Sequence, residues 1–193
     1  MHSTDMSADS LDEQARETLL QIAGKSLRHG LEHGRALTVK ASNYPAELQA
    51  MRASFVTLHR HGDLRGCIGH LEAIQPLVKD VAENAFAAAF RDPRFPPLSE
   101  NELEGLEIHI SVLTPATPMT FSSEEDLIAQ LRPGLDGLIL KDGPNQGTFL
   151  PSVWESLPSP NDFFRHLKLK AGLPISHWSD RLEVYHYETE SFP

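Results

Sequence analysis

The chain has 193 residues, of which 40% are hydrophobic, so it can bury one large core or a core with a small second lobe. Its formal net charge of −10 argues against a non-specific nucleic-acid binder, because such proteins present a basic face to phosphates. A single cysteine excludes an internal disulfide, and no apolar run approaches the length of a membrane-spanning helix.

The same features favour a cytoplasmic protein without membrane contact. One cysteine and no disulfide framework are typical of a reducing compartment. Residues 1–9 lack the basic start and apolar stretch of a signal peptide, and their polar character predicts a disordered tail. Residues 10–193 are expected to form a single domain.

The first half of this domain is predicted to contain two helices around a hairpin. Ser10 and Glu13 have the spacing of a capping box, and apolar residues then follow helical intervals up to Gly30. Residues 54–71 read as a β-hairpin with a turn near His61-Gly62-Asp63. Pro76 begins an apolar helix that the proline-rich segment after residue 91 ends.

The second half starts with a strictly alternating strand, Leu106–Leu113. A short helix near residues 123–131 and a hairpin across residues 137–150 follow, within a stretch bracketed by prolines. This stretch, about residues 115–155, is predicted to form a small lobe.

The remaining elements decide the fold class. Ser159 and Pro160 begin a helix that Gly172 ends, and residues 182–188 read as a terminal strand. The strands come as hairpins or singly between helices, without the regular alternation of a doubly wound sheet. The sequence therefore predicts an α+β fold: a mainly antiparallel or mixed sheet flanked by helices, with a smaller second lobe.

The best candidate for a site is the segment around the only cysteine, Leu64-Arg65-Gly66-Cys67-Ile68-Gly69-His70. Positive charge promotes thiolate chemistry, and glycines in a strand indicate a bulge or a close backbone approach. In this interpretation Cys67 is a nucleophile, and Arg65 activates it or binds an anionic substrate. The N–H groups of Gly66 or Gly69 then face a developing oxyanion.

The direction of the Cys67 side chain depends on the length of the hairpin turn. A two-residue turn at Gly62-Asp63 places Leu58 opposite Cys67 and packs the thiol against aliphatic neighbours. A three-residue turn shifts the register by one, which brings Thr57 opposite Cys67 and His59 onto its face. Both registers remain open, and so does the alternative that the thiol only packs as a small apolar side chain.

Histidines are the candidates for a general base. Glu107, His109 and Ser111 share one face of their strand, but alternate residues are about 7 Å apart and do not hydrogen-bond directly. His109 can approach Cys67 from a neighbouring strand, with His59 and His70 as alternatives. The sequence lacks the spacings of common metal-binding motifs, so no metal site and no cofactor are predicted.

Five segments, in this order and spacing, resemble the AMMECR-one (AMMECR1) domain family, whose prokaryotic members are called AmmeMemoRadiSam system protein A. The resemblance covers about residues 10–190, and the segments are Leu64-Arg65-Gly66-Cys67-Ile68-Gly69, Asp92-Pro93-Arg94-Phe95, Ile110-Ser111-Val112-Leu113, Gly147-Thr148-Phe149-Leu150-Pro151 and Lys170-Ala171-Gly172-Leu173.

The resemblance implies a large and a small lobe with a cleft between them, at which the Arg-Gly-Cys-x-Gly segment is exposed. It also implies association with a Memo-like protein and a radical-SAM protein, but no established reaction. Two positions depart from the family pattern: His70 replaces a small hydroxyl residue, and Lys168 stands where a second cysteine is common. A mechanism that needs two thiols is therefore not expected.

Three functions follow as hypotheses. The first is a cysteine-dependent enzyme, or a component of an enzyme system, with Cys67, Arg65 and His109 as its catalytic residues. The second is a non-catalytic accessory protein that binds a small molecule, a peptide or a partner protein. The third, RNA binding or modification, is disfavoured by the net charge. The residues expected to contact a ligand are Gly66, Gly69, His70 and Arg94.

Overall fold

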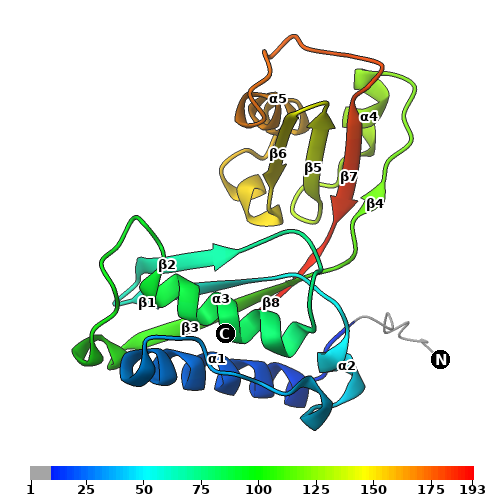
Figure 1. Cartoon of the computed structure of the whole chain (residues 1–193). Helices are drawn as coiled ribbons and strands as arrows, with labels where there is room; N and C mark the ends of the chain where they lie inside the picture. Colours follow the sequence, from blue (N-terminus) through cyan, green and yellow to red (C-terminus); the bar gives the residue numbers. More distant parts are fainter. Residues whose placement is uncertain (1–9) are drawn as a thin grey trace, which may run out of the picture. The chain divides into compact units, whose positions relative to one another are not determined.

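The computed structural model describes residues 10–193, which form two compact units (Figure 1). Unit 1 contains the described residues up to Leu113 together with Glu190–Pro193, and unit 2 is Thr114–Thr189. Each unit has its own hydrophobic core and its own four-stranded antiparallel sheet, which confirms the α+β class. The tail predicted over residues 1–9 lies outside the described residues.

Unit 1 is a sheet with helices along one face (Figure 1). The strand order is β2-β1-β3-β8. Apolar side chains alternate along β1, where Val56 and Leu58 are fully buried in the core that the helices share. The elements are α1 (Glu13–His33), α2 (Ala46–Gln49), β1 (Ser54–Arg60), β2 (Asp63–Gly69), α3 (Leu77–Phe90), β3 (Leu106–Leu113), β8 (Thr189–Phe192) and 3₁₀ helices at Ala41–Asn43 and Glu100–Leu103.

Helix α1 begins and ends later than its sequence signals suggest. The capping residue is Asp12, whose Oδ1 accepts the N–H of Ala15 at 2.7 Å, so the capping box expected at Ser10 is wrong. The helix continues past Gly30 to Gly34, which has the left-handed φ of +69° of a C-terminal cap. Gly30 instead allows contact with α3, because a Cβ there would lie 2.4 Å from the Phe90 ring.

Unit 2 has the strand order β4-β7-β5-β6, with α4 and α5 in the same unit. Its core joins Leu138 and Leu140 of the sheet to Phe163 of α5, and Trp154 stacks on the Phe163 ring at 3.8 Å. The elements are β4 (Thr117–Pro118), α4 (Glu124–Gln130), β5 (Gly137–Asp142), β6 (Asn145–Phe149), a 3₁₀ helix at Pro151–Glu155, α5 (Pro160–Lys170) and β7 (Glu183–Tyr187).

The strand expected over residues 182–188 is β7, and the chain then adds β8 to the sheet of unit 1. The short strands β4 and β8 were not predicted. Glu190 of β8 accepts the N–H of Leu11 at 3.1 Å and pairs with Arg16, which ties the start of α1 to this strand. Within residues 10–193, no helix combines the length and apolarity needed to cross a membrane.

Candidate functional site

The β1-β2 hairpin contains a bulge that decides where Cys67 points. The turn consists of His61 and Gly62, with φ values of +53° and +83°, so Arg60 pairs with Asp63. The register then shifts, because Arg65 is an extra residue on β2. Thr57 therefore lies opposite Cys67, and the pairing of Leu58 with Cys67, expected from a two-residue turn at Gly62-Asp63, is wrong.

Cys67 lies on the face of the sheet opposite α3. Its neighbour Gly66 faces the helix, where an added Cβ would lie 2.0 Å from the carbonyl oxygen of Ala88. Side chains alternate along a strand, so the thiol points to the other face, beside Thr57. The Sγ atom of Cys67 is 3.2 Å from Thr57 Oγ1, and the residue is partly exposed. The thiol therefore contacts a hydroxyl group, and not the aliphatic side chains expected from the other register.

Thr57 stands between Cys67 and His109. It is the cross-strand partner of Cys67 in β2 and of His109 in β3. The ring of His109 meets that of His59 edge to face, with centroids 5.1 Å apart, and its Nε2 is 3.7 Å from Glu107 Oε2. The structure thus brings His109 and His59 to the face that carries Cys67, with β1 between β2 and β3.

The backbone of Cys67 is held by a carboxylate that the sequence did not single out. Its N–H donates to Asp92 Oδ2 at 3.0 Å, at the outer edge of the sheet. Asp92 is buried, and Arg94 Nε and Nη2 donate to its two oxygens at 3.0 and 2.7 Å. The hydrogen bond from Arg94 is the main reason that the pKa of Asp92 lies well below its ordinary value. Two of the family segments therefore meet at Asp92.

Arg65 has an internal partner. Its Nε donates to Glu102 Oε2 at 2.6 Å and its Nη2 to the carbonyl oxygen of Pro96 at 2.7 Å. The Arg65 side chain is only 10% exposed, and its hydrogen bond lowers the pKa of Glu102 to about 2. This ion pair anchors the bulge to the segment after α3. It uses much of the donor capacity that the sequence suggested for a substrate.

The other predicted contact residues have neighbours within the chain. A Cβ at Gly69 would lie 2.4 Å from the Phe55 ring, so this glycine makes room for the ring. His70 Nε2 is 2.8 Å from Asp80 Oδ1 on α3. Because α3 covers the face opposite Cys67, the structure associates His70 with the helix and not with the thiol.

Asp80 is the centre of a buried polar cluster that the sequence analysis missed. One carboxylate oxygen accepts from Ser54 Oγ at 2.6 Å and from Asn84 Nδ2 at 3.0 Å. The other accepts from Gln75 Nε2 at 2.9 Å and lies beside His70. Asp80 and Asn84 lie four residues apart and share the buried side of α3 with its apolar residues, which is the signal that could have revealed the cluster.

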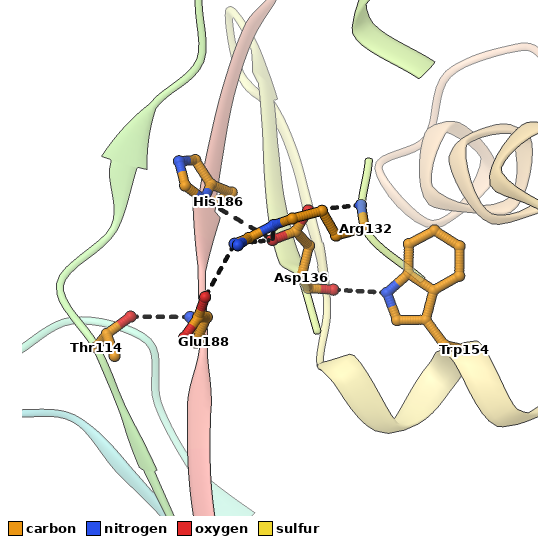
Figure 2. Close-up of polar contacts among 6 residues, drawn as sticks. All are labelled: Thr114, Arg132, Asp136, Trp154, His186 and Glu188. Atoms are coloured by element: carbon orange, nitrogen blue, oxygen red, sulfur yellow. Dashed lines mark hydrogen bonds and ion pairs between the residues drawn. The ribbon is translucent and has the colours of Figure 1, made fainter. Parts of the chain in front are cut away.

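Unit 2 contains a separate polar network, drawn in Figure 2. Arg132 Nη2 donates to Asp136 Oδ1 at 2.7 Å and to Glu188 Oε1 at 2.9 Å. The pKa of Arg132 is raised, and its hydrogen bond to Asp136 is the main cause. The Asp136 carbonyl accepts Trp154 Nε1–H at 2.8 Å. Thr114 and Glu188 exchange hydrogen bonds at 2.8 and 2.9 Å, so the segments entering and leaving unit 2 are tied together.

Lys168 is fully buried in unit 2. Its Nζ donates to Glu124 Oε1 at 2.5 Å and to the Ile175 carbonyl at 2.9 Å, and lies 5.1 Å from the Phe164 ring centroid. The residue links α5 to α4. Among residues 10–193, no three or more histidine, cysteine, aspartate or glutamate side chains gather as a metal ion would require.

Comparisons with known proteins agree over nearly the whole described chain. The AMMECR1 family profile matches residues 20–192. The chain is 35% identical over 181 residues to a protein of Methanothermobacter thermautotrophicus, covering 91% of this chain and 92% of that protein. It is 37% identical over 185 residues to a protein of Methanopyrus kandleri, covering 91% and 86%.

A solved structure is similar as well. The crystal structure of an uncharacterized protein from Pyrococcus horikoshii has a TM-score of 0.83 and 33% sequence identity to this chain. The match covers 95% of this chain and 92% of the other, so it includes both units. Sequence profile, relatives and fold lead to the same conclusion: the chain belongs to the AMMECR1 family.

Proposed function

We propose that the protein is a cysteine-dependent enzyme, or a component of an enzyme system, in which Cys67 is the nucleophile. The observation that supports this is the 3.2 Å contact between Cys67 Sγ and Thr57 Oγ1 on the face opposite α3. The thiolate is the reactive form of cysteine, and a hydroxyl can donate a hydrogen bond to it. The contact keeps the sulfur in a polar setting.

The surrounding residues would divide the remaining roles. Asp92 positions Cys67 through its N–H, so that N–H is not available to an oxyanion. Arg65 positions the bulge through Glu102. His109, the other cross-strand partner of Thr57, is the proposed acceptor of the thiol proton.

The proposed partners are a Memo-like protein and a radical-SAM protein. This part rests on the family resemblance, which implies that the three proteins are encoded together. The substrate is then a small molecule or peptide that one of these proteins supplies or receives. Binding of the purified Memo-like protein to this chain, measured by calorimetry, tests the association.

A non-catalytic binding protein is the second candidate, and one observation favours it. Carboxylates pair with both arginines of the site, Arg65 with Glu102 and Arg94 with Asp92. In this role Cys67 packs against Thr57, and the face opposite α3 docks a ligand or partner.

Alkylation of the only thiol separates the two candidates. The rate of reaction with iodoacetamide is measured from about pH 5 to 9, with reduced glutathione as the reference thiol. The enzyme proposal expects Cys67 to react about tenfold faster than glutathione at neutral pH, and Thr57→Val to remove most of that difference.

Ser111→Ala is the matched control, because it removes a hydroxyl from the same sheet that bonds Ser191 and not Cys67. This variant should keep the wild-type rate. A wild-type rate no faster than that of glutathione would leave the binding role as the better account.

A further inference from the structure

We infer that the ligand of this site carries an anionic group, a carboxylate or a phosphate, and that Arg94 binds it beside Cys67. The inference rests on the proposed function, because it assigns a ligand class to the site in which Cys67 reacts. Its basis is the difference between the two arginines near the thiol and the position of Asp92 between Arg94 and Cys67.

Arg94 is held rigidly on one side and open on the other. Its Nε and Nη2 donate to the two oxygens of Asp92, and its main-chain N–H also donates to Oδ1 at 3.1 Å. These contacts use two of the five N–H donors of the guanidinium. The other three have no hydrogen-bond partner among residues 10–193, and the side chain is 55% exposed.

Arg65 differs from Arg94 in exposure, although its buried Nη1 also lacks a hydrogen-bond partner among residues 10–193. It is buried, and its Nε and Nη2 donate to Glu102 and to the Pro96 carbonyl. Both guanidinium groups lie near the Phe95 ring, with Cζ 5.8 Å from the centroid for Arg65 and 5.4 Å for Arg94. The ring has a buried, paired cation and an exposed one beside it. The exposed cation is the one that can reach a ligand.

Asp92 links the paired edge of Arg94 to the thiol-bearing residue. One oxygen, Oδ2, accepts both the Cys67 N–H at 3.0 Å and Arg94 Nη2–H at 2.7 Å. The pKa of Arg94 is raised, chiefly by its hydrogen bond to Asp92 and to a smaller extent by the charge of Cys67. The guanidinium of Arg94 and the main-chain N–H of Cys67 therefore donate to the same carboxylate oxygen.

The free donors of Arg94 match an anionic group that presents two oxygens side by side. A guanidinium edge donates two parallel N–H groups to carboxylate or phosphate oxygens. The oxygens of a neutral ligand accept the same hydrogen bonds less strongly. Asp92 neutralises the arginine at long range, and the chain carries a net charge of −10, so distant attraction of anions is weak. Recognition then depends on direct hydrogen bonds.

Two alkylating reagents that differ in charge test the inference. Iodoacetate and iodoacetamide both form a carbon–sulfur bond to Cys67 and release iodide, but only iodoacetate carries a carboxylate. The rate constant for iodoacetate divided by that for iodoacetamide should fall about tenfold in Arg94→Gln. This change corresponds to the loss of one charged hydrogen bond. Arg94→Lys keeps the charge without the fork and should retain part of the ratio.

Arg91→Gln is the matched control, because Arg91 is an exposed arginine three residues away. Its ratio should equal that of the wild type. Thermal melting shows whether the Arg94 variants are folded, and Arg94→Lys decides the result if Arg94→Gln is not. An unchanged ratio in the folded Arg94 variant, with rapid reaction of both reagents, overturns the inference and leaves the proposed function intact.

If the wild type reacts with both reagents no faster than glutathione does, the proposed function fails and this inference fails with it. Protection against iodoacetamide by inorganic phosphate or by acetate, at equal ionic strength, shows which anion the site prefers. Protection that disappears in Arg94→Gln supports the inference, and protection that persists there contradicts it.

Discussion

The hydroxyl of Thr57 lies 3.2 Å from the thiol of Cys67, on the face of the hairpin that points away from α3. This contact exists because Arg65 is an extra residue in β2: without it, the pairing of Arg60 with Asp63 would place Val56, and not Thr57, opposite the thiol. A bulge re-aims a side chain without changing the residues around it. The chemistry available to Cys67 is therefore set by a residue whose own side chain points elsewhere.

The ion pair that anchors the bulge predicts a pH-dependent stability. The pKa of Glu102 is about 2 in the folded protein, against 4.5 ordinarily. Its contribution is therefore complete above about pH 4.5 and is lost as the pH falls towards 2. Glu102→Gln should lower the free energy of unfolding at neutral pH by about 1–3 kcal/mol.

Urea denaturation at a series of pH values measures this effect. The difference between wild type and Glu102→Gln should shrink as the pH falls below about 4.5. The exposed Glu104→Gln is the control and should track the wild type at every pH. A constant difference across the acid range would contradict the role assigned to the Arg65–Glu102 pair.

Two glycines predict opposite effects of the same substitution. Gly66→Ala places a methyl group 2.0 Å from the Ala88 carbonyl oxygen, which is backbone and cannot move aside easily. We expect a loss of about 3 kcal/mol. Gly24→Ala, within α1, meets its nearest atom, Ile108 Cδ1, at 3.9 Å and should gain about 0.5–1 kcal/mol from helix propensity. Chemical denaturation of both variants is the measurement, and equal signs would contradict the packing argument.

Replacing the buried carboxylate of Asp80 should lower the stability of the protein without changing the reactivity of Cys67. In Asp80→Asn, an NH2 group replaces one carboxylate oxygen. That group faces the N–H or O–H groups that donated to the oxygen, such as those of Ser54 or Gln75. The free energy of unfolding should fall by about 3 kcal/mol. Because His70 and Asp80 lie on the helix side, the alkylation rate of Cys67 in the folded variant should stay within about twofold.

Glu83→Gln is the control for Asp80→Asn, since Glu83 accepts only from Gln75 and at the surface. It should change stability by less than about 0.5 kcal/mol. A large change in Cys67 reactivity in folded Asp80→Asn would show that the cluster and the thiol are coupled, although they lie on opposite faces of the sheet.

The Lys168–Glu124 pair predicts an asymmetric response. Glu124→Ala leaves a fully buried ammonium without its carboxylate and should lower the free energy of unfolding by about 3 kcal/mol. Lys168→Met leaves Glu124, which is 34% exposed, in contact with water and should cost less than about 1 kcal/mol. Thermal and urea unfolding of the two variants give the comparison. Equal losses would mean that the ion pair itself, and not the buried charge, dominates.

The pattern of the sequence predicts elements well where one face is buried. The alternation of Leu106–Leu113 and the helical spacing after Pro76 both correspond to observed elements, because burial on one side imposes a period on the chain. The register of Cys67 could not be predicted. Moving the turn by one position along the chain changes the residue opposite Cys67 by two, and the bulge at Arg65 changes it by one more step in the other direction.

The site depends on contacts between segments that the sequence keeps apart. Arg94 was expected at the site, but Asp92, which links it to Cys67, was not. A carboxylate beside a proline resembles an ordinary loop residue until the loop is placed against the edge of β2. Short strands such as β8 carry too few residues for an alternating pattern to appear.

The return of the chain to unit 1 through β8 has a consequence for folding. Thr114–Thr189 is inserted between β3 and β8, so the sheet of unit 1 has only three strands until all of unit 2 has been synthesised. Until then the outer edge of β3 is unpaired and the start of α1 lacks Glu190. Unit 2 is one continuous segment, whereas unit 1 is complete only after that segment has been synthesised. The open edge of β3 is therefore exposed to misassembly on the ribosome.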